Sequence, residues 1–266
     1  DVPVAAMLSG GVDSSAIVHL MKKMGHHDVR TYALGMDRDD EDLRRAREMA
    51  EYLGCKHKEY YFNPETQFEN FNKIIGTYGE PIMLLPLIHT YELCENIKND
   101  DIKVVLTGHG ADELFYGYLG HQRTALLTDV LRLTEPLSPL AAMLPNKYMR
   151  GPLALLKAKK GKRKAALYRS LEKGAWGAVI SEDAKHELVN VAAEEMEYWG
   201  GLIDSKYYID ESNFCGLMVE NTHSVMIAGD LPAMMASVEM RAPFLDQDII
   251  SLALATHYRD KVHRKD

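Results

Sequence analysis

The stretch LSGGVDSS, residues 8–15, places two adjacent glycines among three serines and one aspartate. It follows the apolar run VPVAAML, residues 2–8, which predicts a short strand buried on both faces. Apolar residues then recur at helical spacing up to Gly25, which closes the predicted helix. Glycines in such a turn let backbone N–H groups approach an anion, and the helix amino terminus adds positive potential. The stretch therefore predicts a phosphate-binding loop at the carboxyl end of the first strand.

Asp13 is the residue of this loop that would repel a bare phosphate. Its presence makes sense if a divalent cation lies between them, since Mg²⁺ typically bridges carboxylate and phosphate oxygens. The loop lacks the Gly-Lys-Ser/Thr ending of a P-loop. The alternative is an ordinary strand-to-helix turn in which Ser14 or Ser15 caps the helix.

Strand-like and helix-like patterns alternate over the first hundred residues. Three further strands are expected, at VRTYALGM (29–36), HKEYYF (57–62) and IKVVLTG (102–108). Helical spacing separates them, over 43–53, 68–78 and 88–97. This alternation predicts an α/β fold, a parallel sheet with helices on both faces. Strand patterns largely vanish after Gly120, so we expect a nucleotide-binding part over residues 1–120 and a mainly helical part over 121–266.

The composition limits the classes of function. The chain has 266 residues, 46% of them apolar, and its formal net charge of −8 does not favour nucleic acid as a partner. No apolar run approaches the roughly 20 residues that span a bilayer. Three cysteines without metal-ligand spacing are typical of reduced thiols. Since no secretory signal is visible either, we expect a cytoplasmic protein without a membrane partner; the opening at Asp1 indicates a piece of a longer chain.

Two later segments carry further candidate residues. LTGHGADELFYGY, residues 106–118, places glycines around the pair Asp112–Glu113 after the fourth predicted strand, as a second half of a metal–pyrophosphate site would. The alternative is a turn whose acidic pair favours a helix amino terminus. DLPAMMASVEMRAPFLD, residues 230–246, holds Glu239 and Arg241 in an apolar region. The alternative there is a core segment with one satisfied ion pair.

The three segments together resemble the synthetase domain of the asparagine synthetase family. Members of that family read SGGxDSS, SGxGxDExFxGY and DRxSMxxxLExRxPFLD in this order. The first motif alone is similar to the pyrophosphate loop of the N-type ATP pyrophosphatases. The resemblance covers nearly the whole chain and implies an adenine nucleotide alpha hydrolase-like fold, with ATP and Mg²⁺ as cofactors.

The resemblance also implies roles for particular residues. It implies an ATP-binding set, made of Leu8, Ser9, Gly10, Gly11, Asp13, Ser14, Ser15, Met36 and Gly108. Asp13 and Asp112 match the aspartates that hold magnesium in the family. Glu239 matches a glutamate that faces the adenylated substrate. His109 stands where asparagine-forming members have an acidic residue and β-lactam synthetases have a tyrosine. Two interpretations of His109 therefore stay open, as a catalytic base and as a loop residue without a role in catalysis.

Other features depart from the family pattern. Leu231 and Ala233 replace the usual arginine and serine, and no K-x-x-L-R segment follows PFLD, although Lys261 and Lys265 are present. The family's amino-terminal glutaminase domain is absent from this sequence. The basic run KAKKGKRK, residues 157–164, predicts a solvated linker or helix face, with a docking strip for RNA or a partner domain as the alternative.

These observations lead to an expected activity. We expect an AMP-forming carbon–nitrogen ligase that activates a carboxylate as an acyl-adenylate, releases pyrophosphate and transfers ammonia. The ammonia would come from a glutaminase domain or subunit outside this chain, and a homodimer is the candidate assembly. The alternatives are a β-lactam-synthetase-like ligase that uses a substrate amine, a tRNA-modifying enzyme, and a nucleotide-binding regulator without turnover.

Overall fold

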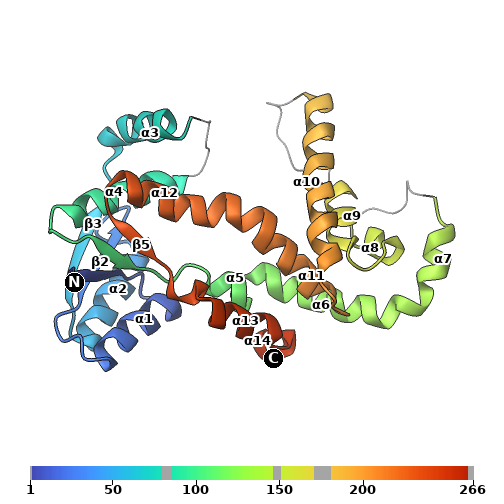
Figure 1. Cartoon of the computed structure of the whole chain (residues 1–266), viewed down its shortest axis with the longest axis horizontal. Helices are drawn as coiled ribbons and strands as arrows, with labels where there is room; N and C mark the ends of the chain where they lie inside the picture. The colour runs from blue at the N-terminus through green and yellow to red at the C-terminus, as the bar shows by residue number, and fades with distance from the viewer. Residues whose placement is uncertain (1, 80–84, 146–150, 171–180, 263–266) are drawn as a thin grey trace. The chain divides into compact units, whose positions relative to one another are not determined.

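The chain folds into two compact units. The computed structural model describes residues 2–79, 85–145, 151–170 and 181–262 (Figure 1). The first unit comprises Asp1–Ala111 with His223–Ser251, and the second comprises Asp112–Thr222 with Leu252–Asp266. Among the helices of the described residues, none combines the length and apolar character that crossing a bilayer requires. Lys265 lies outside the described residues.

A five-stranded, all-parallel sheet forms the centre of the first unit, as expected from the alternating patterns. The strand order is β3-β2-β1-β4-β5. The strands are β1 (Val4–Met7), β2 (Arg30–Gly35), β3 (Lys56–Tyr61), β4 (Val104–Leu106) and β5 (Glu239–Arg241). β1 is central because Ala6 pairs with Thr31 of β2 on one side and with Leu106 of β4 on the other.

Helices cover both faces of this sheet, which confirms the expected α/β architecture. Ala5 and Ala6 of β1 are both buried but belong to different apolar clusters, because successive strand residues point to opposite faces. On the face of Ala6 lie α1 (Val12–Lys23) and α2 (Glu41–Leu53). On the face of Ala5 lie α3 (Pro64–Tyr78), α4 (Leu85–Lys98) and α12 (Ile227–Met235) (Figure 1).

β5 and α12 come from the part of the sequence that we expect to be mainly helical. β5 pairs with β4, and α12 packs its buried Ala233 into the core on the face of Ala5. His223–Ser251 therefore belongs to the unit that contains the sheet, whereas the sequence pattern suggests a single change of character near residue 120. The pattern does not reveal β5 because the strand has three residues, and two of them are charged.

The second unit is helical, as the sequence predicts. It contains helices from the middle of the chain, namely α6 (Leu119–Thr134), α7 (Ser138–Met143), α8 (Pro152–Lys157), α9 (Arg163–Ser170), α10 (Glu182–Leu202) and α11 (Tyr208–Cys215). The 3₁₀ turn η1 (Glu135–Leu137) joins α6 to α7, and α14 (Tyr258–Lys261) lies near the end of the chain. α5 (Ala111–Phe115), a π-helical segment (Gly216–Met226) and α13 (Gln247–Ala255) span the boundaries between the units.

A buried carboxylate fixes the start of α9 in this unit. Glu211 of α11 is only 4% exposed. Its two carboxylate oxygens accept hydrogen bonds from the backbone N–H groups of Gly161 (3.0 Å), Arg163 (2.6 Å) and Lys164 (3.1 Å). These donors have no partner within α9 itself, since the first N–H groups of a helix precede its hydrogen-bond ladder. One side chain from α11 therefore caps a helix nearly fifty residues earlier in the chain.

Three histidines make the stability of the fold depend on pH. Burial lowers the pKa of His57, His89 and His121, so each imidazole is neutral in the folded chain at neutral pH. In the unfolded chain a histidine takes up a proton near pH 6.5. The stability that these residues contribute is therefore complete above about pH 6.5 and is lost as the pH falls through their lower folded pKa values. We expect a lower urea midpoint at about pH 5.5 than at about pH 7.5.

A pair of variants checks the origin of this decrease. His89→Gln removes one of these three half-buried imidazoles, so the urea midpoint of the variant should fall less between the two pH values. His26→Gln alters an exposed histidine and should keep the full decrease. If both variants fall equally, the pH dependence comes from groups other than His89.

Candidate functional site

The two glycine-rich loops of the first unit follow neighbouring strands of the sheet. The strand order reverses between β1 and β4, and in parallel α/β sheets the crevice at such a switch point binds ligands. The loop after β1 contains Ser9–Gly11, and the loop after β4 contains Thr107–Gly110. A Cβ atom built on Gly108 would lie 3.1 Å from the backbone nitrogen of Ser14 and 3.2 Å from the Cβ of Asp13. The fold therefore brings together two segments that are a hundred residues apart.

The backbone of the first loop requires a glycine at position 10. Gly10 has φ +73°, and a Cβ atom there would lie 2.6 Å from the Cβ of Arg45 and 2.7 Å from the backbone nitrogen of Ala46, both in α2. Gly11 is the N-cap of α1, and among the described residues no side chain caps this helix. Ser14 or Ser15 as the cap, the alternative that the sequence offers, is therefore not what the structure shows. The amino terminus of α1 is left open to an anion.

The serine hydroxyls of this loop have two different surroundings. The Ser14 hydroxyl lies 3.1 Å from the Ser9 hydroxyl, accepts from the Ser9 N–H at 3.2 Å and donates to the Gly11 carbonyl at 3.3 Å. The Ser15 hydroxyl is buried and has no hydrogen-bond partner within the described part of the chain. Ser14 thus shapes the loop, whereas Ser15 has a donor that a bound anion would satisfy.

Thr107 is a candidate that the sequence reasoning missed. Its hydroxyl is also buried without a partner among the residues that the structure describes. Its backbone N–H donates to the carbonyl of Arg241 at 2.9 Å, which places it at the carboxyl end of β4 beside Gly108. The signal in the sequence is a polar residue directly after the apolar run of β4, immediately before a glycine.

Leu8 and Met36, the predicted adenosine contacts, follow β1 and β2. The Leu8 side chain is buried, and its N–H donates to the carbonyl of Tyr32 at 2.9 Å. The Met36 side chain is 60% exposed, and its N–H donates to the carboxylate of Asp40 at 2.9 Å. Both N–H groups are thus engaged in the fold, which leaves the carbonyls and the exposed Met36 side chain to contact a nucleotide.

The two predicted magnesium ligands belong to different units. Asp13 lies in the first turn of α1, and Asp112 is the first residue of the second unit. The Asp112 side chain rests against Gly117, where a Cβ atom would overlap its carboxylate. In the described residues no three His, Cys, Asp or Glu side chains converge as a metal cage.

Glu239 and Arg241 form an ion pair on β5. The Arg241 Nε atom lies 2.7 Å from the Glu239 carboxylate, and both side chains are more than half exposed. The hydrogen bond from Arg241 lowers the pKa of Glu239, so this carboxylate is ionised and is a weakened base at neutral pH. Arg241 pairs with Leu106 at the carboxyl end of β4, whereas Glu239 pairs with Val104 at its start. Arg241 is therefore the nearer of the two to Thr107 along the sheet.

His109 is half-buried between the loop after β4 and α12. A Cβ atom built on Gly229 of α12 would lie 3.1 Å from Nδ1 and Cε1 of His109 and 3.1 Å from the sulfur of Met240. The ring thus has a defined position against a helix that carries no side chain at the contact. Sequence reasoning proposed His109 but gave no sign that Gly229 supports it.

The Gly229→Ala variant tests the role of His109 without changing the histidine. Alanine favours a helix by about 1 kcal/mol over glycine, so the melting temperature should hold or rise slightly. The added methyl group would displace the imidazole by a few tenths of an ångström. If His109 acts in catalysis, we expect the rate of ATP-dependent AMP release to fall roughly tenfold, because small misplacements of catalytic groups are costly.

The matched control is Gly76→Ala, in the middle of α3, where an added methyl group meets no atom within 4 Å. This variant should gain helix stability and keep its rate. Equal rates in the two variants would show that the position of the His109 ring does not matter for turnover.

Comparisons with known proteins find one matching family and several relatives. A family whose description is "Asparagine synthase" matches residues 1–266. "Asparagine synthetase [glutamine-hydrolyzing] 1" of Bacillus subtilis is 26% identical over 266 residues, 95% of this chain and 40% of that protein. "Asparagine synthetase [glutamine-hydrolyzing]" of Rattus norvegicus is 34% identical over 128 residues, 45% of this chain and 22% of that protein. An Arabidopsis thaliana asparagine synthetase is 33% identical over 131 residues, 45% of this chain and 22% of that protein. The chain thus spans less than half the length of these relatives.

Proposed function

Because the chain belongs to the asparagine synthase family, we propose that its full-length protein uses ATP to activate a carboxylate for amide formation. The observation that carries this proposal is the uncapped amino terminus of α1, with the buried Ser15 hydroxyl beside it. Backbone N–H groups at such a helix end bind phosphate oxygens, and they suit a reaction that builds up negative charge on pyrophosphate.

In the first step, a carboxylate oxygen of the substrate attacks the α-phosphorus of ATP. The bond from that phosphorus to the bridging oxygen of the β-phosphate breaks, and its electrons leave with pyrophosphate. The loop from Ser9 to Ser15 would hold the departing group through its N–H and hydroxyl donors. Mg²⁺, when bound, supplies positive charge to the phosphate oxygens. Asp13 would be one carboxylate ligand of this ion. The family resemblance predicts Asp112 as a second ligand.

In the second step, ammonia attacks the acyl carbon, and AMP leaves with the electrons of the broken carbon–oxygen bond. The attacking nitrogen must lose a proton, for which His109 is the candidate base, since histidine is the side chain that most often transfers protons in catalysis. The pKa of Glu239 is lowered by Arg241, so its carboxylate is suited to orienting the nitrogen, which becomes positively charged as it bonds to the acyl carbon. The names of the relatives mention glutamine hydrolysis, and we propose that a glutaminase domain or subunit supplies the ammonia.

A second candidate keeps the same first step and uses an amine of the substrate itself as the nucleophile. The observation that favours it is His109, an imidazole at the position where a ligase of that kind has a tyrosine. The Gly229 contact gives this ring a fixed place in the first unit.

The test is pyrophosphate release by the full-length protein from ATP and Mg²⁺, with ammonia, over a panel of carboxylic acids that includes aspartate. We expect release that depends on one acid and yields AMP and pyrophosphate in equal amounts. Formation of an amide from that acid when ammonia is omitted would favour the substrate amine as nucleophile. In each case release should disappear in Asp13→Ala while circular dichroism remains that of the wild type.

Two outcomes would contradict the proposal. If ATP binds but no acid on the panel causes release, the protein behaves as a nucleotide-binding regulator. If ATP does not bind at all, the assignment of residues 8–15 as a phosphate loop is wrong.

A further inference from the structure

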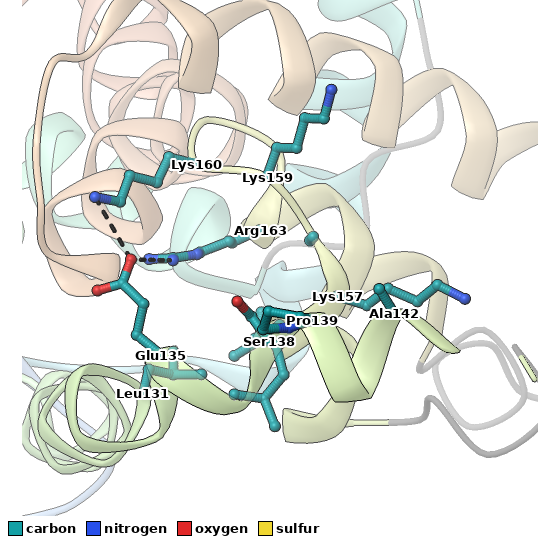
Figure 2. Close-up of a pocket in the computed structure, with 12 residues that line it drawn as sticks. Leu131, Glu135, Ser138, Pro139, Ala142, Lys157, Lys159, Lys160 and Arg163 are labelled. Atoms are coloured by element: carbon teal, nitrogen blue, oxygen red, sulfur yellow. Dashed lines mark ion pairs between the residues drawn. The ribbon is translucent and has the colours of Figure 1, made fainter. Parts of the chain in front are cut away.

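The second unit contains a cavity that the proposed reaction does not use. It has a volume of about 420 Å³ and lies between α6, η1 and α7 on one side and α8 with the start of α9 on the other. Figure 2 shows its lining. Its walls combine apolar and polar side chains, and the buried Leu131 and Leu155 join a core cluster that also includes Tyr208. Cavities of roughly 300–1,000 Å³ with apolar walls and a few polar groups are typical small-molecule sites.

The charged groups around this cavity are unbalanced. Lys157, Lys159, Lys160 and Arg163 line it, against a single acidic side chain, Glu135. The same Glu135 oxygen lies 3.6 Å from Lys160 Nζ and 3.9 Å from Arg163 Nη2, and both distances are too long for hydrogen bonds. Figure 2 shows Lys160 and Arg163 directed at Glu135, whereas the Lys159 side chain extends away from it.

Arg163 is the most constrained of these cations. Its side chain is only 13% exposed. Its Nε atom is buried and lacks a hydrogen-bond partner among the residues that the structure describes. A guanidinium presents its donors in a fixed planar fork that matches a carboxylate or a phosphate. The fold thus holds an under-used anion-binding group at the wall of a cavity.

The amino terminus of α9 does not account for this arrangement. Its N–H groups, including that of Arg163, already donate to the buried carboxylate of Glu211. The backbone of Arg163 is therefore occupied by the cap, while its side chain faces the cavity.

We propose that this cavity binds a small organic anion, one carboxylate or phosphate group on an apolar body, with Arg163 and Lys160 holding the charged group. The apolar body would lie against Leu155 and the neighbouring wall. The proposal is independent of the nucleotide reaction, because every lining residue belongs to the second unit. The sequence alone predicts that the basic run 157–164 is a solvated linker or helix face. In this proposal, part of the run binds an anion instead.

The test is isothermal titration calorimetry of the whole chain with three probes that share one ring system. 1-Naphthoate and 1-naphthyl phosphate carry the two candidate charged groups, and 1-naphthol carries neither. We expect the anions to bind at least tenfold more tightly than 1-naphthol, and the tighter anion identifies the head group. In Arg163→Gln the affinity for the anions should fall about tenfold or more, with no change for 1-naphthol. Lys206→Gln, an exposed lysine of the same unit, should match the wild type.

A second variant keeps the proposal testable if Arg163→Gln fails to fold. Ala142 is exposed and lines the cavity, so Ala142→Phe fills the space without disturbing the core. It should remove the binding of the anions while circular dichroism stays unchanged. The proposal is overturned if the anions bind the wild type no more tightly than 1-naphthol. It is also overturned if folded Ala142→Phe, or folded Arg163→Gln, binds them as the wild type does.

Discussion

Replacing Gly10 with alanine should destabilise the first unit by about 2–5 kcal/mol and abolish pyrophosphate release. Two costs add at this position. The left-handed φ of +73° costs an alanine about 1–2 kcal/mol. The new methyl group would also lie 2.7 Å from the backbone nitrogen of Ala46, and relieving this overlap requires α2 and the loop to move apart, at about 1–3 kcal/mol. Because the loop is the proposed cradle for pyrophosphate, activity should be lost even in the fraction that remains folded.

Gly54→Ala separates these two costs. Gly54 has φ +65°, close to that of Gly10, but a Cβ atom there would meet nothing within 4 Å. We expect this variant to lose only about 1–2 kcal/mol and to keep its activity. Urea denaturation and pyrophosphate release, measured on both variants, check the comparison. If both variants lose the same free energy of unfolding, the close approach of α2 to the loop does not contribute to the cost at Gly10.

Replacing Glu211 with leucine should destabilise the second unit by about 3–5 kcal/mol, the second large effect. The change leaves the N–H groups of Gly161, Arg163 and Lys164 without their acceptor, and a leucine cannot replace the two oxygens. Glu211→Gln keeps one acceptor oxygen and should cost about 1–3 kcal/mol. Burial raises the pKa of Glu211, while the three N–H groups act in the opposite direction.

The matched control is Glu220→Leu. Glu220 lies near Lys164 at 3.3 Å but is 46% exposed, and such surface pairs contribute at most about 1 kcal/mol. Urea denaturation followed by circular dichroism at 222 nm measures each variant. If Glu211→Leu is no less stable than Glu220→Leu, the cap on α9 does not stabilise this unit.

The sequence predicts the architecture of the sheet well, because buried parallel strands and the helices between them leave periodic apolar patterns. It does not predict β5, since the pairing of Glu239–Arg241 with β4 is a long-range contact that three residues cannot encode locally. Gly10 illustrates a second limit. Its left-handed φ belongs to the loop, but the nearness of α2 is a property of the assembled fold.

The candidate site shows the same division between local and long-range information. The glycine-rich loop and its aspartate are recognisable from a few adjacent residues. Ser14, in contrast, turns its hydroxyl back to Ser9 instead of capping α1, and this follows from the shape of the loop. The support of His109 by Gly229 depends on which loop and helix become neighbours, and composition or spacing carries no trace of that.

The late arrival of β5 has a consequence for how the sheet is completed during synthesis. The chain leaves the sheet at Leu106 and returns at Glu239, after the whole of α6 to α11 has been made. At about 5–20 residues per second, a ribosome needs on the order of ten seconds to make this stretch. Throughout that time β4 is an unpaired edge with exposed N–H and C=O groups, which other chains can extend by strand addition. A nascent chain that ends before β5 should therefore aggregate through β4, and chaperone binding would be needed most while the helical unit is being translated.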